Sequence, residues 1–399
     1  TGISLVQRIV AGLVIGALLG MFVPSEGGIA ILGDVFVGAL KAIAPLLVFF
    51  LVISSLCYAG KSHGGVIRTV IIMYMFSTFL AAIVAVTASS VFPVTLTLVD
   101  AATDMAAPQG VAEVLRTLLM NVVTNPVQSL VSANYIGILV WAVLIGIALR
   151  KASDTTKQSL NDISAALSKT VTWIIQCAPF GIMGLVYNTV SVNGLSTFTE
   201  YGKLLAVLLG SMLFIYFVTN PILVFWCIRK NPYPLIFKCL KKSAITAFFT
   251  RSSAANIPIN MEACAEMGLD KDTYSVTIPL GATINMDGAA ITITVMTLAA
   301  AHTLGIAVDI PSAIILSILA TLSACGASGV AGGSLLLIPM ACSLFGISND
   351  IAMQIVGIGF IIGVIQDSVE TALNSSSDLL LSASAEFRQW RLEGKEIKF

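Results

Sequence analysis

The last long hydrophobic stretch, residues 351–385, constrains the fold of this chain more than any other feature. It exceeds the roughly 20 residues that a helix needs to cross a lipid bilayer, yet it carries Asp367, Thr371, Asn374 and Asp378. Their spacing places these four side chains on one face of a helix. Since a carboxylate is costly in the membrane interior, this face is interpreted as a binding site that faces protein, water or an ion. The alternative is a stripe that only joins helices, although Ser, Thr and Asn usually serve that purpose.

The composition is that of a protein embedded in a membrane. Hydrophobic residues make up 57% of the chain and charged residues 11%, against about 25% charged in soluble domains. A soluble chain of this kind could not cover its surface with polar groups. The sequence therefore predicts an all-α polytopic membrane protein that is surrounded by the lipid bilayer. Its formal charge of zero gives no indication of a nucleic-acid partner.

Eight apolar segments are long enough to span the bilayer. They are residues 5–23, 30–58, 66–92, 113–150, 162–190, 202–228, 274–300 and 351–385, and the fourth is interrupted at Asn125-Pro126. Basic residues such as Arg8, Lys61 and Arg150 lie at alternate segment ends, and acidic residues such as Asp34 lie at the opposite ends. Because positive charge stays on the cytoplasmic side, this pattern and the even number of crossings place both termini in the cytoplasm.

Two further apolar stretches, residues 234–267 and 310–346, are each broken in the middle by small polar residues. The breaks run from Thr250 to Asn256 and from Cys325 to Ser334. Each arm has about 10–16 residues, or roughly 15–24 Å of helix, which is too short to cross but long enough to enter and return. Such re-entrant hairpins occur where their tips are buried in protein or line a wet cavity. The alternative is a pair of kinked spans, which would give ten crossings.

The two hairpins belong to a repeated pattern. Hairpin 234–267 is followed by a helix that contains Asn285 and Asp287, and hairpin 310–346 is followed by the helix with Asp378. Since each hairpin returns to its own side, the two units start on opposite faces of the membrane and form an inverted repeat. Broken helices at matching positions of two halves indicate the binding site of a secondary transporter.

The run Asn285-Met286-Asp287-Gly288 indicates a cation site within the first of these helices. Gly288 is expected to let the helix unwind, so that free carbonyl groups join the side-chain oxygens of Asn285 and Asp287. Hard monovalent cations such as sodium prefer oxygen ligands, by the logic that holds for calcium and magnesium. The alternative is a kink whose aspartate has ordinary hydrogen-bond partners.

Four motifs carry a resemblance to a known family. They are TRSS at 250–253, PLGATINMDG at 279–288, GASGVAGGS at 326–334 and DSVETALNSSSD at 367–378. Through them the chain resembles, over nearly its whole length, the dicarboxylate/amino acid:cation symporter family, which includes the glutamate transporters and the neutral amino acid exchangers. Within this family it is most similar to the bacterial sodium:serine/threonine symporters, through SSAANIPIN at 252–260 and QDSVETALNSSSD at 366–378.

The resemblance implies a fold, an assembly and a mechanism. The fold has eight transmembrane helices plus two re-entrant helical hairpins in inverted repeats, and the protein assembles as a homotrimer in the bacterial inner (plasma) membrane. A trimerisation scaffold comprises residues 1–60 and 110–190, and a transport domain comprises residues 66–92 and 202–385 with both hairpins. The transport domain would move across the membrane like an elevator, with hairpin 310–346 as its gate. The implied function is transport without covalent chemistry, so the chain is not expected to be an enzyme.

The resemblance also implies substrate contacts. Asp367 matches the aspartate that holds the substrate's amino group, and Asn374 matches an asparagine that also contacts the substrate. The residues that match the hairpin tips holding the α-carboxylate are Ser252, Ser253, Val330, Ala331 and Gly332. Glu370 and Thr371 are assigned to the same pocket.

Three sodium sites are implied in the same way. The residues that match the first are Gly281, Asn285, Asn374 and Asp378, and Thr283 with carbonyl groups of the second hairpin tip matches another. The residues that match the third are Tyr74, Ser77, Thr78, Asn285 and Asp287, with Ser77 in place of a more usual Thr. Sodium would neutralise Asp287 and Asp378, so the ion and the substrate are expected to bind cooperatively.

Glu370 is the departure from the family that bears most on the substrate. Members that transport acidic substrates carry an arginine here, which binds a side-chain carboxylate in bidentate fashion. Glu370 would repel such a carboxylate, which favours a small neutral or hydroxylated amino acid, here L-serine or L-threonine. Alternatively, Glu370 pairs with Arg251 and has a structural role. Ala289 also replaces a Thr that is common in the family, and Ala331 replaces a Pro.

Other functions are weighed against serine and threonine symport. The first is transport of another neutral amino acid or of a dicarboxylate, although Asp367 favours a ligand with an amine. The second is an intramembrane serine protease, since residues 326–329 fit the pattern GxSG, but no histidine follows His302 to act as its base. The third is a channel, which would need neither two gates nor an amine-binding aspartate.

Overall fold

The computed structural model describes residues 5–24, 27–58, 65–98, 119–120, 123–325, 327 and 332–397, and the regular structure of these residues is entirely helical. The first half contains α1 (Leu5–Phe22), α2 (Gly27–Tyr58), α3 (Gly65–Val91), α5 (Pro126–Val131), α6 (Tyr135–Ala148), η1 (Leu149–Lys151), α7 (Asp154–Gln176) and α8 (Ala178–Asn193). The second half contains α9 (Thr197–Phe214), η2 (Ile215–Thr219), α10 (Asn220–Ile228), α11 (Tyr233–Cys239), η3 (Leu240–Ala244), α12 (Ile245–Thr250), α13 (Ser253–Glu266), α14 (Lys271–Ile284), α15 (Asp287–Thr303), α16 (Ile310–Ala324), η4 (Gly333–Leu337), α17 (Ile338–Ser343) and α18 (Asn349–Leu392).

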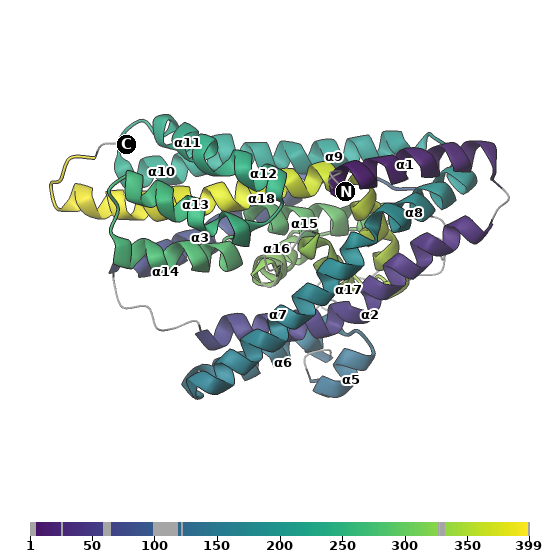
Figure 1. Ribbon diagram of the computed structural model, residues 1–399, viewed down its shortest axis with the longest axis horizontal. Helices are drawn as coiled ribbons and strands as arrows, with labels where there is room; N and C mark the ends of the chain where they lie inside the picture. The colour runs from purple at the N-terminus through teal and green to yellow at the C-terminus, as the bar shows by residue number, and fades with distance from the viewer. Residues whose placement is uncertain are drawn as a thin grey trace.

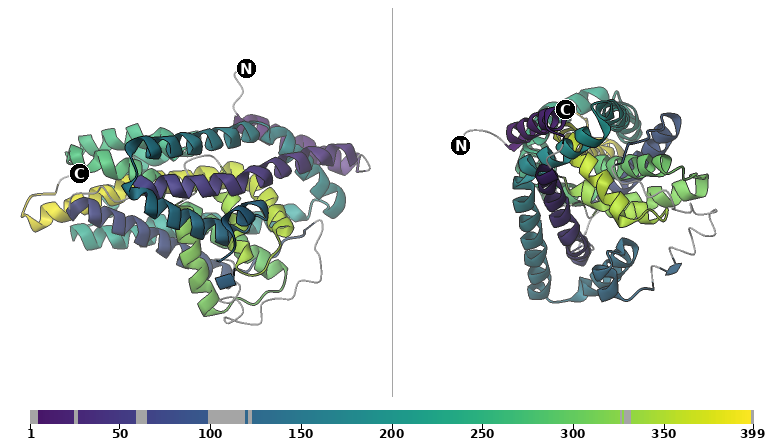
Figure 2. Two further views of the ribbon diagram at one scale, coloured as in Figure 1. Left: turned by 90° about the horizontal axis from the view of Figure 1, so that it is seen from below. Right: turned by 90° about the vertical axis from the view of Figure 1, so that its right-hand side faces the viewer.

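The helices pack in two groups (Figures 1 and 2). In the first group α1 lies along α8, and α2 packs against α6, α7 and α8. In the second group α15 contacts α3, α9, α16, α17 and α18, and α18 also contacts α10 and both arms of the first hairpin, α12 and α13. The second group therefore surrounds the polar face of α18 with helices from several parts of the sequence.

A stripe of glycines explains the close packing of α1 on α8. Gly12 and Gly16 lie one turn apart, and a Cβ atom on them would come within 2.2 Å of the Pro179 carbonyl oxygen and 2.4 Å of the Met183 carbonyl oxygen. No side chain fits in these spaces, so the two backbones touch. Small residues at this spacing are a common means of joining helices in membranes, where burial of apolar surface gives little driving force.

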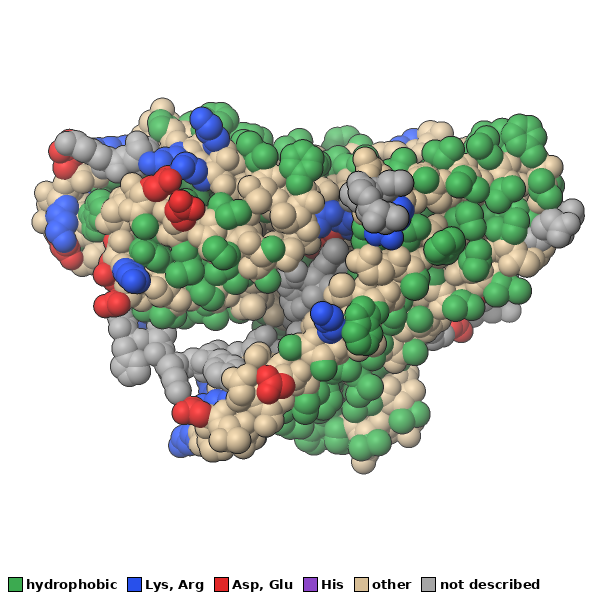
Figure 3. Space-filling model, in the orientation of Figure 1, with side chains coloured by type: hydrophobic (Ala, Val, Ile, Leu, Met, Phe, Trp, Pro, Cys, Tyr) green, Lys and Arg blue, Asp and Glu red, His purple; other side chains and the backbone are tan. Residues whose placement is uncertain are grey.

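Several helices have the length and composition of membrane spans. In the described part of the chain these stretches are Gly27–Ser54, Gly65–Val91, Thr197–Ile228, Lys271–Thr303 and Asn349–Leu392, and the bent pair α7 and α8 would be a sixth. Hydrophobic side chains cover wide areas of the surface, and few charged side chains lie on its right-hand part in this view (Figure 3). Both observations indicate a multi-pass membrane protein.

The structure differs from the predicted segments in two places that matter for the path of the chain. The segment predicted at 162–190 is bent by 56° between α7 and α8 at Cys177, because Pro179 in the first turn of α8 cannot donate a backbone hydrogen bond to the preceding turn. The segment predicted at 274–300 is interrupted at Asn285 and Met286, so Gly288 lies within α15 and is not itself unwound. Of the segment predicted at 113–150, residues 113–118, 121 and 122 lie outside the described residues.

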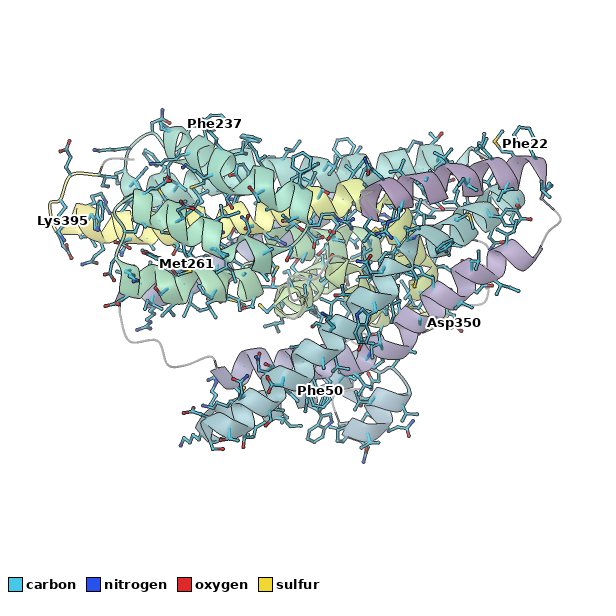
Figure 4. All side chains as sticks on the ribbon, in the orientation of Figure 1. Phe22, Phe50, Phe237, Met261, Asp350 and Lys395 are labelled. Carbon is cyan, nitrogen blue, oxygen red and sulfur yellow. The ribbon has the colours of Figure 1, made fainter. Side chains whose placement is uncertain are left out.

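Both predicted hairpins are helical arms that contact each other. In the first, α12 and α13 are separated only by Arg251 and Ser252, and Ser252 caps α13 by accepting a hydrogen bond from the Ala255 backbone N–H at 3.2 Å. In the second, α16 contacts η4 and α17. The last helix, α18, runs past both hairpins; in Figure 4 the labelled Asp350 lies in its first turn and Lys395 lies just beyond its last residue.

Candidate substrate and cation site

Asp367 on α18 is the point at which the two hairpin tips meet. The guanidinium Nε of Arg251, from the first hairpin, lies 2.6 Å from Asp367 Oδ2. The backbone N–H of Gly332, from the second hairpin, donates a hydrogen bond to Asp367 Oδ1 at 3.1 Å. The predicted amine-binding aspartate is therefore held by a cation of the protein itself.

The backbone at both tips is shaped for these contacts. Arg251 has φ of 53°, in the left-handed region that residues other than glycine seldom adopt, and it ends α12 there. Gly332 has φ of 74°, and a Cβ atom on it would come within 3.0 Å of the Phe360 ring. Glycine suits this position for two reasons: it adopts a positive φ readily, and it has no side chain to contact Phe360.

A small cavity of about 10 Å³ lies between the tips and α18. Its lining residues are Arg251, Ser253, Met286, Ala327, Ser334, Asp367, Glu370, Thr371 and Asn374. This volume is close to the minimum for one water molecule, so the site is closed. Of the predicted substrate contacts, Ser253, Asp367, Glu370, Thr371 and Asn374 are thus brought together.

The remaining predicted substrate contacts lie beside this cavity or beyond the described residues. Ser252 forms the cap of α13, and Gly332 binds Asp367, as described above. Thr371 donates its hydroxyl hydrogen to the Asp367 carbonyl oxygen of its own helix at 2.7 Å. Val330 and Ala331 lie outside the described residues.

Glu370 does not pair with Arg251, so that alternative is wrong. Its Oε2 accepts hydrogen bonds from Thr292 Oγ1 at 2.7 Å, from Ser334 Oγ at 2.9 Å and from the amide nitrogen of Gln366. The ionic partner of Arg251 is Asp367, one turn earlier on the same face of α18. Glu370 is therefore stabilised by neutral donors from three elements.

Hydrogen bonds of two side-chain amides, those of Asn285 and Asn374, join the break between α14 and α15 to α18. Asn374 Oδ1 accepts a hydrogen bond from the Gly288 backbone N–H at 2.7 Å. Asn285 donates its side-chain N–H to Asp378 Oδ1 at 2.9 Å. A Cβ atom on Gly281 would come within 2.9 Å of Asp378 Cγ, so this glycine lies against the same carboxylate. The four residues predicted for the first sodium site are thus neighbours.

A second buried carboxylate, Asp287, is bound by hydroxyl groups of α3. Ser77 Oγ donates to Asp287 Oδ2 at 2.8 Å, and Thr78 Oγ1 donates to Oδ1 at 3.2 Å. Tyr74, one turn earlier on α3, donates its hydroxyl hydrogen to the carbonyl oxygen of Asp378 at 3.0 Å or of Thr277 at 3.2 Å. The residues predicted for the third site therefore fall into two groups: Ser77 and Thr78 bind Asp287, and Tyr74 binds the backbone of Asp378.

Thr283, predicted for the remaining sodium site, donates its hydroxyl hydrogen to the Leu280 carbonyl oxygen of its own helix at 2.7 Å. The thiol of Cys325 lies 3.7 Å from the Ile284 carbonyl oxygen, which brings the second hairpin next to the end of α14. The second hairpin thus lies beside Thr283, as this site requires, but the Thr283 hydroxyl is hydrogen-bonded within its own helix.

Three buried carboxylates of the site, Asp287, Asp378 and Glu370, have no cationic side chain of the described residues as a partner. The ion pairs between described residues are Lys242–Glu266, Arg251–Asp367 and Lys395–Glu393. None of them includes Asp287, Asp378 or Glu370, although all three are at most 5% exposed. In addition, the side-chain oxygen of Asn285 is buried and accepts no hydrogen bond from the described part of the chain. A cation with oxygen ligands fits the unpaired charge of Asp378 and the free oxygen of Asn285.

Some residues of the site were not predicted from the sequence. Thr292, Ser334 and Gln366 surround Glu370, and Met286 lines the cavity. The position of Gln366 could have been predicted, since it precedes Glu370 by four residues and so lies on the same face of the helix. Thr292 and Ser334 lie on other elements, and no spacing in the sequence relates them to Glu370.

Comparison with known proteins agrees with this arrangement. The chain matches the model of the sodium:dicarboxylate symporter family over residues 5–386. It is 56% identical over 397 residues to the serine/threonine transporter SstT of Bifidobacterium adolescentis, covering 99% of this chain and 92% of the relative. It is 57% identical over 389 residues to SstT of Streptococcus thermophilus, covering 97% of each, and 57% identical over 384 residues to SstT of Streptococcus agalactiae, covering 96% of each. By this match over nearly its whole length, and by the helical site that its motifs build, the chain belongs to the sodium:dicarboxylate symporter family.

Proposed function

We propose that this protein is a secondary transporter that takes up L-serine and L-threonine together with sodium ions. The observation that carries the proposal is the convergence of two hairpin tips on Asp367, beside buried carboxylates that have no protein cation. The relatives described above bear the name serine/threonine transporter, which supports the same substrates.

The amino group of the substrate would replace the guanidinium of Arg251 at Asp367. Both are cations, so the carboxylate keeps a partner throughout, and the buried charge is never left uncompensated. Ser253 and the backbone of Gly332 would bind the α-carboxylate. These contacts require the hairpins to open, because the cavity of about 10 Å³ is too small for an amino acid.

Sodium ions would bind at Asp378 with Asn285, and at Asp287 with Ser77 and Thr78. Asn374 links the two kinds of site, since it lines the cavity and binds the Gly288 backbone at the break. An ion that orders this break would also position Asn374 for the substrate. By thermodynamic linkage, the substrate must then raise the affinity for sodium by the same factor. Each net positive charge moved inward gains about 2.3 kcal/mol per 100 mV of membrane potential.

The movement proposed is that of an elevator. The fold would comprise eight spans and two re-entrant hairpins in inverted repeats, in a homotrimer in the bacterial inner membrane with both termini in the cytoplasm. Residues 1–60 and 110–190 would form the fixed scaffold, and residues 66–92 and 202–385 would form the moving domain. The helices α1, α2, α6, α7 and α8 pack mainly on one another and make smaller contacts with α17, η4 and α18, which supports this division.

Uptake by proteoliposomes tests the function. Purified protein is reconstituted, and uptake of each of the twenty amino acids is measured with an inward sodium gradient and without one. We expect serine and threonine to accumulate only with the gradient. Accumulation of a dicarboxylate instead, or of serine without sodium, would contradict the proposal.

A further inference from the structure

Three arginines gather at the end of α10. Arg229 ends this helix with φ of 54°, and Arg391 of α18 donates its Nε hydrogen to the Cys227 carbonyl oxygen at 3.0 Å. The guanidinium carbon of Arg388 lies 5.3 Å from the centre of the Trp226 ring. None of the three arginines belongs to an ion pair between described residues. Their remaining N–H groups can therefore bind an anion.

An apolar groove of about 320 Å³ lies beside α10. Val218, Ile222 and Phe225 line it from one side, and Pro232 and Tyr233 line it from the start of α11. The Tyr233 hydroxyl donates a hydrogen bond to the Phe217 carbonyl oxygen at 3.2 Å, where Pro221 lacks the N–H that an α-helix would supply. This bond fixes α11 against η2, so the groove is a built feature of the fold.

Helix periodicity places the groove and the arginines on one face. Val218, Ile222, Phe225 and Arg229 follow one another at intervals of four, three and four residues, so Arg229 continues the face that lines the groove. From Val218 to Arg229 the helix rises about 16 Å, close to the hydrocarbon depth of one leaflet, about 15 Å. Ile222 is 64% exposed and Phe225 is 50% exposed. An apolar chain in this groove would bring an attached anion to Arg229.

A membrane lipid supplies both parts of such a ligand in one molecule. The charge pattern of the sequence puts this end of α10 at the cytoplasmic surface, where anionic lipids attract basic residues. Trp226 and Tyr233 are both exposed, and these residue types are enriched at the level of lipid head groups. The helices α10 and α11 and the last turns of α18 lie at the same end of the molecule (Figure 1). A soluble anion would leave the groove unfilled, and an uncharged lipid would leave the arginines unpaired.

We propose that an anionic phospholipid of the cytoplasmic leaflet binds here, with an acyl chain in the groove and its phosphate on Arg229 and Arg388. Basic pockets between membrane helices on the cytoplasmic side bind head groups of this kind. The planar set of donors in a guanidinium group matches the oxygens of a phosphate. The groove shares no lining residue with the cavity at Asp367, so the inference does not depend on the proposed function.

The test measures the melting temperature of the purified protein in detergent with added short-chain lipids. Dioctanoyl phosphatidylglycerol has both parts of the ligand, dioctanoyl phosphatidylcholine has no net charge, and glycerol 1-phosphate has no acyl chain. We expect phosphatidylglycerol to stabilise the protein at concentrations about tenfold or more below those that phosphatidylcholine requires. Glycerol 1-phosphate should have no effect at these concentrations. Equal effects of the two lipids, or of glycerol 1-phosphate and phosphatidylglycerol, would overturn the inference.

Two double variants locate the head group. Arg229→Gln with Arg388→Gln removes two charges from the site, and about 10- to 30-fold more phosphatidylglycerol should then be needed for the same stabilisation. Arg8→Gln with Arg68→Gln is the matched control. Both of these arginines are exposed in the first turns of α1 and α3, on the same predicted side of the membrane and away from the groove. The control should respond to phosphatidylglycerol like the wild type.

Ile222→Trp tests the groove alone, because it fills apolar space and leaves every arginine in place. We expect both lipids to bind more weakly to this variant. It also covers the case in which the variant at Arg229 and Arg388 does not fold. An unchanged response to phosphatidylglycerol in whichever of these two variants folds would overturn the inference, while sodium-coupled serine uptake would be unaffected by that result.

Discussion

Arg251 and Asp367 form an ion pair across the site, with the guanidinium Nε 2.6 Å from the carboxylate Oδ2 and side chains only 10% and 4% exposed. The two residues are 116 positions apart in the sequence, on the tip of the first hairpin and on α18. In the closed structure a protein cation thus occupies the place proposed for the amino group of the substrate. Arg251 and the substrate would compete for one carboxylate.

Asp367→Ala is expected to abolish sodium-dependent serine uptake. The variant removes the carboxylate that would bind the amino group, and it leaves Arg251 buried without its partner. Loss of a partner from a buried pair typically costs about 3–5 kcal/mol. Uptake is measured with labelled serine in proteoliposomes, with equal reconstitution verified by immunoblot. Uptake at the wild-type level would contradict the role given to Asp367.

Arg251→Gln should have the opposite effect on binding. It leaves Asp367 buried without a cation, so the empty protein should melt at a lower temperature, while the substrate no longer competes with the guanidinium. We expect serine to bind several-fold more tightly and to raise the melting temperature more than it does in the wild type. Weaker serine binding together with an unchanged melting temperature would show that the two cations do not compete.

Asp287→Asn should raise the sodium concentration needed for half-maximal uptake by about tenfold or more. The substitution keeps the size of the side chain and its possible contacts with Ser77 and Thr78, but it removes the charge that would bind sodium. Asp272→Asn is the matched control, because Asp272 is exposed in the first turn of α14. An equal sodium dependence in both variants would contradict a cation site at Asp287.

Gly281→Ala tests the first sodium site by a steric change alone. The added methyl group would come within 2.8 Å of Tyr74 Oη and 2.9 Å of Asp378 Cγ, so these groups must move apart. We expect weaker sodium binding and slower uptake. Gly210→Ala on α9 is the control, since a Cβ atom there meets nothing within 4 Å, and it should behave like the wild type or be slightly more stable. Similar behaviour of the two variants would argue against a tightly built site at Gly281.

The residues on α18 could be predicted because helix periodicity alone relates them. Asp367, Thr371 and Asn374 line one cavity, as their spacing indicates. The local run around Asp287 likewise indicated the break in its helix, although the break lies at Asn285 and Met286, just before the expected glycine. Patterns within one helix are local, and local geometry follows from sequence spacing.

Contacts between distant elements could not be predicted in the same way. The alternative pairing of Arg251 with Glu370 was as compatible with the sequence as its pairing with Asp367, because both carboxylates lie on the same face of α18. Which of them the arginine reaches depends on the left-handed backbone at Arg251 and on the donors that already surround Glu370. The bend at Cys177 was missed for a related reason, since Pro179 breaks a helix without interrupting its apolar pattern.

Coupling between serine and sodium is tested by the effect of each on the binding of the other. Calorimetry on the purified protein gives the affinity for serine at low and high sodium, and the affinity for sodium with and without saturating serine. We predict that each ligand raises the affinity for the other, and by the same factor. Serine binding that is independent of sodium concentration would contradict it.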